Sequence, residues 1–230
     1  MRLLDIGCGW GSMAMHAAEH YGAQVLGVTI SEQQHELARK RVAAAGLESQ
    51  VEIRFQDYRD IPDEAFDRVS SIGMFEHVGE RRLGEYFDKI DSLLVPGGRL
   101  LNHAINRSVQ QKRARVDPDG FMARYVFPDG ELLESGQVVS AINQSGLEVR
   151  HLESLREHYA HTLRHWVARL ESNWDEAVRL TSLGRARVWK LYMAASAAGF
   201  ESGEFNLTQI LAVKPEDGNS HMPVRQYWKP

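Results

Sequence analysis

Residues 3–11 read LLDIGCGWG, an apolar strand that runs through an acid into three glycines at alternate positions. A helical pattern begins at Ser12, so the glycines lie in a strand-to-helix turn. Such a turn brings backbone N–H groups close to a bound ligand. The carboxylate of Asp5, just before the turn, can accept hydrogen bonds from loop amides or hold the amino end of a methionine-like ligand.

The spacing of these glycines separates two classes of ligand. Dinucleotide sites favour the pattern G-x-G-x-x-G/A, with an acid about 20 residues further on for the ribose. Here Gly7, Gly9 and Gly11 alternate, and the next expected strand ends in Thr29 rather than an acid. We therefore favour a pocket for a nucleoside joined to an amino acid over one for NAD. A tight turn without a ligand is the remaining alternative.

The composition limits the functional class. The 230 residues are 43% apolar and 25% charged, which is typical of a soluble globular protein. A net charge of −4 argues against a nucleic-acid partner bound through its phosphates. The single cysteine, Cys8, excludes an internal disulfide and fits a reducing, cytoplasmic compartment. No apolar run approaches the roughly 18 residues of a membrane span, so a lipid substrate would be reached from outside the bilayer.

Apolar runs and helical patterns alternate along the chain, which indicates a mostly parallel sheet with helices on both faces. We expect one Rossmann-like α/β domain with seven strands over residues 1–213 and a loose tail over 214–230. The expected strands are residues 2–6, 25–29, 51–55, 66–72, 99–105, 147–152 and 206–213. The expected helices are residues 12–21, 31–45, 80–94, 135–145 and 157–199. A turn at 96–98 and a long irregular stretch at 106–134 complete the prediction.

Residues 157–199 form a helical insertion before the last expected strand. We expect it to be a lid over the carboxyl ends of the strands, where such sheets bind ligands. Three histidines on it, His158, His161 and His165, resemble a metal stripe. Residues seven apart on a helix lie about 10.5 Å apart along its axis, too far for one zinc ion. Only the last two could share an ion, and we expect no metal.

Polar side chains follow the second expected strand. Thr29 and Gln34 carry a hydroxyl and an amide, which can bind ribose hydroxyls much as an acid does. Ser31 lies between them and is also a good cap for the helix that follows. These residues therefore predict one edge of a nucleoside pocket.

The third expected strand is followed by QDYRD at residues 56–60. Asp57 can accept a hydrogen bond from the amino group of adenine, and the ring of Tyr58 can stack on the base. The alternative is a polar loop in which Arg59 and Asp60 form a surface ion pair of little energetic value.

Candidate catalytic groups follow the two central strands. Glu76 and His77 come shortly after the expected strand 66–72 and lie over the ligand cleft. We expect Glu76 to take part in the chemistry and His77 to have a structural role. His103, on the expected strand 99–105, points into the same cleft; a buried core histidine is the alternative.

Taken together, these motifs resemble the cyclopropane-fatty-acyl-phospholipid synthases and the mycolic acid cyclopropane synthases. The stretches that carry the resemblance are LDIGCGWG at 4–11, GVTIS at 27–31, QDYRD at 56–60, GMFEHVG at 73–79, YVFPDG at 125–130 and YAHTL at 159–163. The glycine turn alone indicates only a methyltransferase. The runs at 56–60 and 73–79 are more specific, and the similarity extends to about residue 213.

The resemblance implies a class I methyltransferase fold and transfer of a methyl group from S-adenosylmethionine to the double bond of an unsaturated acyl chain. The chain would be carried by a phospholipid or an acyl carrier, and the product would be a cyclopropane or a methyl or methylene branch. It also implies a bound bicarbonate as base, held at Glu76, His103, the backbone of Ile105, and Tyr159. The family's cofactor positions fall on Asp5, Gly7, Gly9, Thr29, Ile30, Gln34, Asp57, Tyr58 and Ile72.

One departure from the family pattern concerns the segment before the glycine turn. The family has a further cysteine ligand there, together with part of the cover over the cofactor. Cys8 is no substitute, because it lies inside the turn. Only two residues precede the apolar core of the first strand, and we expect an upstream segment in the natural protein.

The chemistry of an alkene sets further expectations. Its attack on the sulfonium methyl leaves a carbocation, so the cleft must exclude water and benefits from aromatic faces. Candidates for these faces are Phe75, Tyr125, Tyr159 and Trp166. Basic residues at 107–115 (Arg107, Lys112, Arg113 and Arg115) would suit a lipid or carrier phosphate, or form a solvated loop.

The lipid substrate implies peripheral contact with the inner membrane face. Two alternatives stay open. One is a small-molecule N- or O-methyltransferase with Glu76 or His103 as a direct base. The other is a non-catalytic, cofactor-binding homologue.

Overall fold

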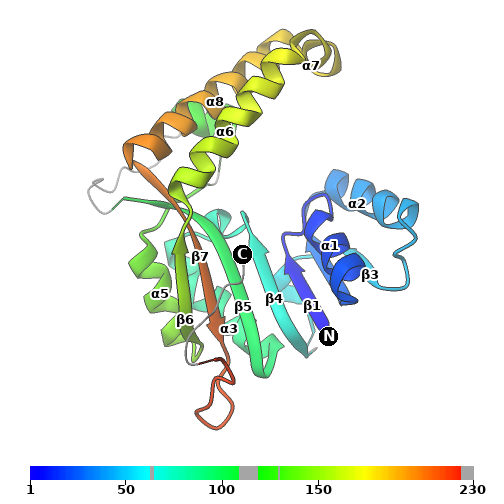
Figure 1. Cartoon of the computed structure of the whole chain (residues 1–230), viewed down its shortest axis with the longest axis vertical. Helices are drawn as coiled ribbons and strands as arrows, with labels where there is room; N and C mark the ends of the chain where they lie inside the picture. The colour runs from blue at the N-terminus through cyan, green and yellow to red at the C-terminus, as the bar shows by residue number, and fades with distance from the viewer. Residues whose placement is uncertain (63–64, 109–118, 129, 224–230) are drawn as a thin grey trace.

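The computed structural model describes residues 1–62, 65–108, 119–128 and 130–223. One seven-stranded sheet has the order β3-β2-β1-β4-β5-β7-β6, in which β7 runs antiparallel to β5 and β6 and the other paired strands run parallel (Figure 1). The strands are β1 (Arg2–Ile6), β2 (Gln24–Thr29), β3 (Val51–Phe55), β4 (Phe66–Ile72), β5 (Leu94–Arg107), β6 (Glu148–Ser154) and β7 (Phe205–Val213). The mostly parallel seven-stranded sheet predicted from the sequence is confirmed.

Helices surround the sheet on both faces. They are α1 (Ser12–Tyr21), α2 (Glu32–Ala44), α3 (Leu83–Leu93), α4 (Phe121–Tyr125), α5 (Ser135–Gln144), α6 (Arg156–Ser172), α7 (Trp174–Leu180) and α8 (Leu183–Ser202). Three single 3₁₀ turns, η1 (Tyr58–Asp60), η2 (Phe75–His77) and η3 (Glu80–Arg82), follow strands β3 and β4.

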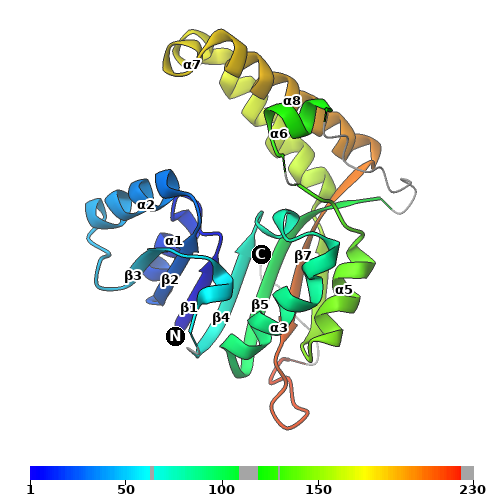
Figure 2. The ribbon, with the colours of Figure 1, turned by 180° about the vertical axis from the view of Figure 1, so that it is seen from behind.

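Alternate residues of the central strands face two separate hydrophobic cores. Leu3 of β1 packs with α1 and α2 on one face, whereas its neighbour Leu4 packs with α3 and α5 on the other. Successive side chains of a strand point to opposite faces, so two apolar neighbours fit a strand covered on both sides. Figure 1 shows α1 and α2 beside β1–β3, and Figure 2, seen from behind, shows α3 and α5 over β4, β5 and β7.

The strand order reverses between β1 and β4. The chain proceeds outward from β1 through β2 to β3, then returns to place β4 on the other side of β1. Open α/β sheets bind ligands at the carboxyl ends of the strands beside such a reversal. The glycine turn after β1 and the loop after β4 therefore meet at the expected ligand edge.

Helices α6, α7 and α8 form a hairpin that rises from the carboxyl edge of the sheet, between β6 and β7 (Figures 1 and 2). The sequence predicted one helical stretch over 157–199. The structure divides it at Asn173 and again at residues 181–182. The hairpin base has its own core, in which Leu163 of α6 and Phe200 of α8 pack on Leu207 of β7.

Two further expectations, about the start of β5 and about residues 106–134, needed correction. Strand β5 begins at Leu94 rather than 99, because the predicted turn at 96–98 is a bulge inside it, with Gly97 at φ +74°. The predicted irregular stretch at 106–134 contains the end of β5 and the short helix α4, while residues 109–118 and 129 lie outside the described residues. Those outside residues include Lys112, Arg113 and Arg115.

The beginning of the tail is also better ordered than expected. The backbone N–H of Lys214 donates to the carbonyl of Gly98, and its ammonium contacts the carboxylate of Asp91 at 3.2 Å. The tail is therefore tied to α3 and β5 for its first residues, and 224–230 lie outside the described part. Among the described helices, none combines the length and apolar character needed to cross a membrane.

Candidate active site

The glycine turn has the geometry of a ligand-binding loop. Gly7 and Gly9 have φ values of +73° and +54°. Residues with a side chain rarely adopt this left-handed backbone conformation. The N–H groups of Gly7 and Cys8 both donate to the carbonyl of Val28 at 3.0 Å, which fixes the turn to β2. A Cβ on Gly7 would lie 2.6 Å from the side chain of Met74, whereas one on Gly9 would meet nothing within 4 Å. Gly9 thus leaves its backbone open to a ligand.

Asp5 lies at the carboxyl end of β1 and is only 2% exposed. Its Oδ1 accepts a hydrogen bond from the hydroxyl of Ser70 at 2.8 Å, while its buried Oδ2 has no partner among the described residues. Burial raises the pKa of Asp5 to about 6, and the Ser70 hydrogen bond opposes that rise only in part. A buried acceptor without a donor suits a ligand that brings an N–H group.

Thr29 and Gln34, the residues predicted to bind ribose hydroxyls, lie together at the end of β2. The Thr29 hydroxyl donates to Gln34 Oε1 at 2.8 Å, so each side chain orients the other. The hydroxyl of Ser31 accepts the backbone N–H of Gln34 and caps α2. Ile30, between them, is 72% exposed.

The end of β3 differs from the expectation in one contact. The alternative interpretation of this loop paired Arg59 with Asp60, but the Arg59 guanidinium instead donates to both carboxylate oxygens of Asp57, at 3.0 and 2.7 Å. The reason is local: Asp57 also accepts the N–H of Arg59 and caps η1, which places the two side chains together. Hydrogen bonding to Arg59 lowers the pKa of Asp57. The ring of Tyr58 contacts Tyr86 edge-on, with centroids 5.3 Å apart.

Glu76 is held in η2, directly after β4. Its Oε1 accepts the backbone N–H of Ile105 in β5 at 2.8 Å, and its Oε2 is buried with no partner among the described residues. Burial raises the pKa of Glu76, and the Ile105 hydrogen bond offsets part of that effect. The N–H of Glu131 donates to the carbonyl of Glu76 at 2.8 Å and anchors the turn. Ile72, the last residue of β4, is 39% exposed at this edge.

His103 stands in β5 beside Ile72 of β4 and opposite Gln209 of β7. Its Nδ1 lies 3.0 Å from the amide nitrogen of Gln209. Burial lowers the pKa of His103, which favours the neutral imidazole. His103 and Ile105 occupy the same face of β5, two residues apart, so the Glu76 carboxylate is held next to the histidine's strand.

Tyr159 projects from α6 and packs between two aromatic rings. Its centroid lies 5.0 Å from that of Phe200 and 6.0 Å from that of Trp166, both edge-on. Burial raises the pKa of Tyr159 to about 12, with smaller contributions from Tyr192 and from the charge of Glu76. The phenol is therefore a neutral hydrogen-bond donor at physiological pH.

Three nearby residues were not identified as site residues from the sequence. Tyr192 of α8, whose pKa is raised mainly by burial and also by Glu76, contacts the ring of Phe127 at 5.7 Å. Phe127 in turn contacts His77 at 5.9 Å, which links the loop after β4 to the helical hairpin. Gln209 is the third. Phe127 lies in the motif YVFPDG at 125–130 that carries part of the family resemblance, whereas nothing in the sequence pointed to Gln209.

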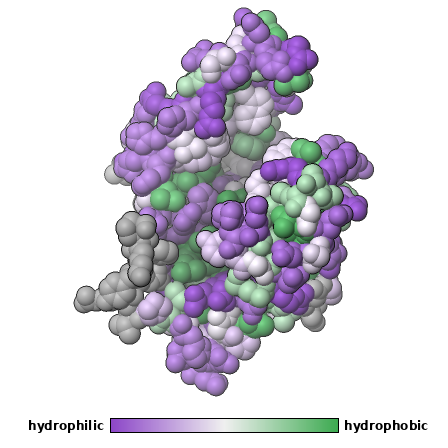
Figure 3. Space-filling view, turned by 45° about the vertical axis from the view of Figure 1, so that its right-hand side comes forward, coloured by the Kyte–Doolittle hydropathy of each residue, from purple (hydrophilic) through white to green (hydrophobic). Residues whose placement is uncertain are grey.

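The other aromatic candidates divide into two groups. Tyr125 and Trp166 are 50% and 41% exposed. Phe75 is only 2% exposed and packs against Tyr86 and Phe87 in the core, so it does not line the cleft as expected. Figure 3 shows the surface hollowed between the hairpin and the body of the molecule, with hydrophobic patches in the hollow.

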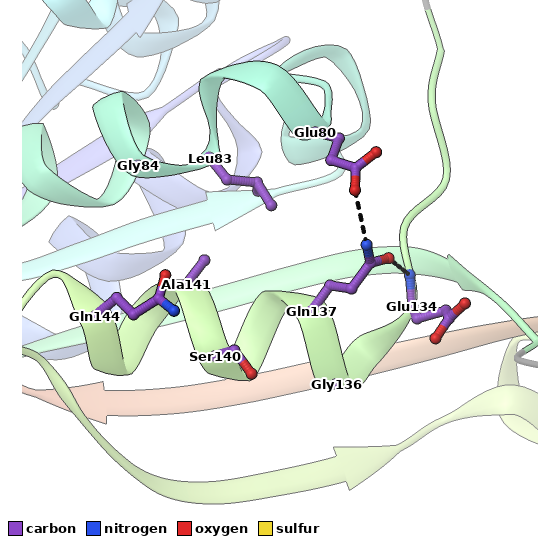
Figure 4. Close-up of a pocket in the computed structure, with 9 residues that line it drawn as sticks. All are labelled: Glu80, Leu83, Gly84, Glu134, Gly136, Gln137, Ser140, Ala141 and Gln144. Atoms are coloured by element: carbon purple, nitrogen blue, oxygen red, sulfur yellow. Dashed lines mark hydrogen bonds between the residues drawn. The ribbon is translucent and has the colours of Figure 1, made fainter.

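A separate hollow of about 700 Å³ lies between α3 and α5 (Figure 4). The side chain of Gln137 crosses its mouth, donating to Glu80 at 3.0 Å and accepting from the N–H of Glu134 at 3.1 Å. None of the candidate site residues lines it, so it is not the predicted ligand pocket. Across the described ranges, no group of three or more His, Cys, Asp or Glu side chains could hold a metal ion.

Comparison with known proteins agrees with this geometry. The family model for mycolic acid cyclopropane synthetase matches residues 1–210. A probable fatty acid methyltransferase of Mycobacterium tuberculosis is 46% identical over 230 residues, which are 100% of this chain and 53% of that protein. The cyclopropane-fatty-acyl-phospholipid synthase of Escherichia coli K12 is 36% identical over 92% of this chain and 53% of its own length.

Solved structures give the same result. A cyclopropane synthase from Mycobacterium tuberculosis superposes with a TM-score of 0.86 at 28% identity, covering 93% of this chain and 78% of that one. A mycolic acid cyclopropane synthase complexed with SAH and CTAB gives a TM-score of 0.85 at 30% identity, with the same coverage. The fold is that of class I methyltransferases, and the chain spans about half the length of the curated relatives above. From its motifs, its sheet and these matches, the chain belongs to the mycolic acid cyclopropane synthetase family.

Proposed function

We propose that this chain binds S-adenosylmethionine and transfers its methyl group to the double bond of an unsaturated acyl chain carried by a phospholipid or an acyl carrier. The observation that carries the proposal is the state of Glu76. Its carboxylate is fixed by Ile105, and one oxygen is buried without a donor beside the strand of His103. A built acceptor of this kind needs a ligand to complete it.

The cofactor would lie across the carboxyl ends of β1, β2, β3 and β4. When bound, S-adenosylmethionine supplies a methyl group on a positively charged sulfur. The unpartnered Oδ2 of Asp5 would accept from its amino group, and the glycine turn, with Gly7 held against Met74 and the backbone open at Gly9, would lie against the amino-acid part. The nucleoside part would contact residues at the ends of the next three strands, namely Thr29, Ile30, Gln34, Asp57, Tyr58 and Ile72.

A bicarbonate ion fits the groups around Glu76. Its O–H could donate to the orphan Oε2, and the neutral phenol of Tyr159 could donate to one of its oxygens. Bicarbonate would supply the base for the proton that leaves the added methyl group. The N–H of Ile105 already donates to Glu76, so in this arrangement the backbone of Ile105 serves the ion by fixing that carboxylate. Loss of a proton from a neighbouring carbon instead would give a methylene branch.

The protein must also protect a cation on the acyl chain from water. A cation over an aromatic face gains about 0.5–2 kcal/mol. Tyr159, Trp166 and Tyr192 place such faces on the hairpin, above the sheet edge. We infer that residues 1–213 are the catalytic domain, that 157–199 form its substrate lid, and that an apolar channel between them admits the chain.

Peripheral contact with the inner face of the membrane follows from that substrate. Met122, Tyr125 and Phe127, on and just after α4, are 37–50% exposed, and the guanidinium of Arg185 on α8 lies 3.4 Å from the Tyr125 carbonyl. An exposed aromatic and apolar group beside an arginine suits the interface of a lipid bilayer.

The test is incubation with methyl-labelled S-adenosylmethionine and vesicles of unsaturated phospholipid. We expect label in the acyl chains, and none in vesicles of saturated phospholipid. Label in a small water-soluble acceptor instead would favour an N- or O-methyltransferase. Cofactor binding without transfer to any acceptor would favour a non-catalytic homologue.

A further inference from the structure

We propose that Gln209 is a positioning residue that fixes His103 as the neutral tautomer protonated at Nε2. His103 would then present a permanent N–H donor to the anion beside Glu76. The inference deepens the proposed function, since the anion site belongs to it, but its evidence is a contact within the protein itself.

The contact follows from strand register. His103 of β5 and Gln209 of β7 stand directly opposite each other in an antiparallel pair. Residues opposite one another in such a pair project to the same face, so their side chains meet. The amide nitrogen of Gln209 lies 3.0 Å from Nδ1 of His103.

The chemistry of the two groups then determines the tautomer. An amide NH₂ can only donate, so the Nδ1 that it approaches must accept. A neutral imidazole carries one proton, which must then reside on Nε2. Burial lowers the pKa of His103 and so acts in the same direction, against the doubly protonated ring.

Among the described residues of β4 and β6, none competes with Gln209 for Nδ1 of His103. The residue paired with His103 on β4 is Ile72, which is apolar, and Oε1 of Glu76 accepts the backbone N–H of Ile105. On β6, Glu153 pairs in register with Gln209 rather than with His103, and it is exposed. A carboxylate at position 209 would instead hold a proton on Nδ1 and favour the imidazolium.

The consequence is a division of roles within the site. A histidine whose Nδ1 accepts an amide N–H is poorly suited to take up a second proton, because the ring would then lose that hydrogen bond. His103 is therefore an oriented donor, and proton removal is left to the anion that it holds.

The experiment is ¹⁵N NMR of histidine side chains in the full chain, without cofactor or lipid. The His103 signals are assigned by their loss in His103→Asn. We expect the wild-type protein to show a neutral His103 protonated at Nε2 at pH 8. In Gln209→Glu we expect the pKa of His103 to rise by at least one unit and its proton to move to Nδ1. Gln144→Glu, the same change on an exposed position of α5, should leave His103 unaltered.

A wild-type His103 protonated at Nδ1, or a Gln209→Glu spectrum with unchanged His103 tautomer and pKa, would overturn the proposal. If Gln209→Glu does not fold, Gln209→Leu replaces it, and the expected result is a mixture of both neutral tautomers. Transfer assays add a second readout: kcat should fall about tenfold in Gln209→Leu with KM for S-adenosylmethionine unchanged. Because the NMR result needs no substrate, failure of label to reach acyl chains would leave it standing.

Discussion

Glu76 and Ile105 are joined by a hydrogen bond between a carboxylate oxygen and a backbone N–H in the neighbouring strand. The bond fixes the carboxylate plane and leaves Oε2 buried without a donor. Burying a charged group in this way costs stability unless a partner arrives. The free protein is therefore less stable than it would be with this group paired, and its acceptor is already in position for a ligand.

Replacement of Glu76 by Gln tests this acceptor. The amide oxygen can still accept from Ile105, but the amide nitrogen would donate where the carboxylate accepted. We expect methyl transfer to fall at least 100-fold, with the free energy of unfolding unchanged or increased. Glu19→Gln, on the exposed end of α1, is the matched control and should keep full activity. Normal activity in Glu76→Gln would contradict the role of Oε2.

Asp5→Asn should separate stability from cofactor binding. The pKa of Asp5 is raised from 3.8 to about 6 in the folded protein, so the unfolded chain loses this proton first. Stability of the free protein should consequently fall as pH rises from about 3 to about 7, by about 3 kcal/mol in total from this group alone. Denaturant unfolding at pH 4 and pH 7 should show a decline that is smaller in Asp5→Asn.

The same substitution, Asp5→Asn, should weaken the binding of S-adenosylmethionine. Calorimetric titration should show S-adenosylmethionine binding the wild-type protein more tightly as pH rises through 6, because the charged carboxylate is the better partner for an ammonium. Asp5→Asn should lose that pH dependence. Equal affinities for the two proteins at pH 7 would exclude a cofactor role for Asp5.

Alanine at two glycines of one turn should have different effects. Gly7→Ala places a Cβ 2.6 Å from Met74 in addition to the strain of positive φ, and should cost about 2–4 kcal/mol of stability. Gly9→Ala has only the strain and should cost about 1 kcal/mol. Its Cβ would instead occupy ligand space, so cofactor affinity should fall at least tenfold. Urea unfolding and calorimetry measure both; equal loss of stability in the two variants would contradict the packing argument.

Tyr159→Phe removes a hydroxyl while keeping the ring that packs on Phe200 and Trp166. We expect kcat to fall about 10–100-fold, as for loss of one oriented donor, with melting temperature unchanged. Because the pKa of Tyr159 is about 12, the pH–rate profile between 6 and 9 should keep its shape. Tyr21→Phe, 71% exposed at the end of α1, is the control. A change in the profile's shape would indicate that the phenol titrates during catalysis.

Much of the framework could be predicted from the sequence because it is encoded locally. The alternation of glycines after Ile6, the cap at Ser31 and the apolar runs of the strands each depend on a few neighbouring residues. Strand ends carry the candidate groups, so the carboxyl-edge cluster of Asp5, Thr29 and Glu76 follows once the sheet is parallel.

The contacts that complete the site could not be predicted in this way. Gln209 meets His103 through the pairing of β5 with β7, and the bond from Ile105 to Glu76 depends on a turn between β4 and α3. Arg59 pairs with Asp57 rather than with Asp60 because Asp57 caps η1, a contact that exists only in the folded turn. Phe75 was misjudged since its position next to Glu76 did not show that its ring turns into the core.

The insertion of β7 between β5 and β6 also bears on biosynthesis. The partner of His103 is 106 residues further along the chain, and it emerges after the entire helical hairpin. On a ribosome that produces roughly 5–20 residues per second, the first four strands can pair many seconds before this contact becomes possible. A nascent chain can therefore form the glycine turn after β1 early, whereas the contact between His103 and Gln209 forms only after β7 has emerged.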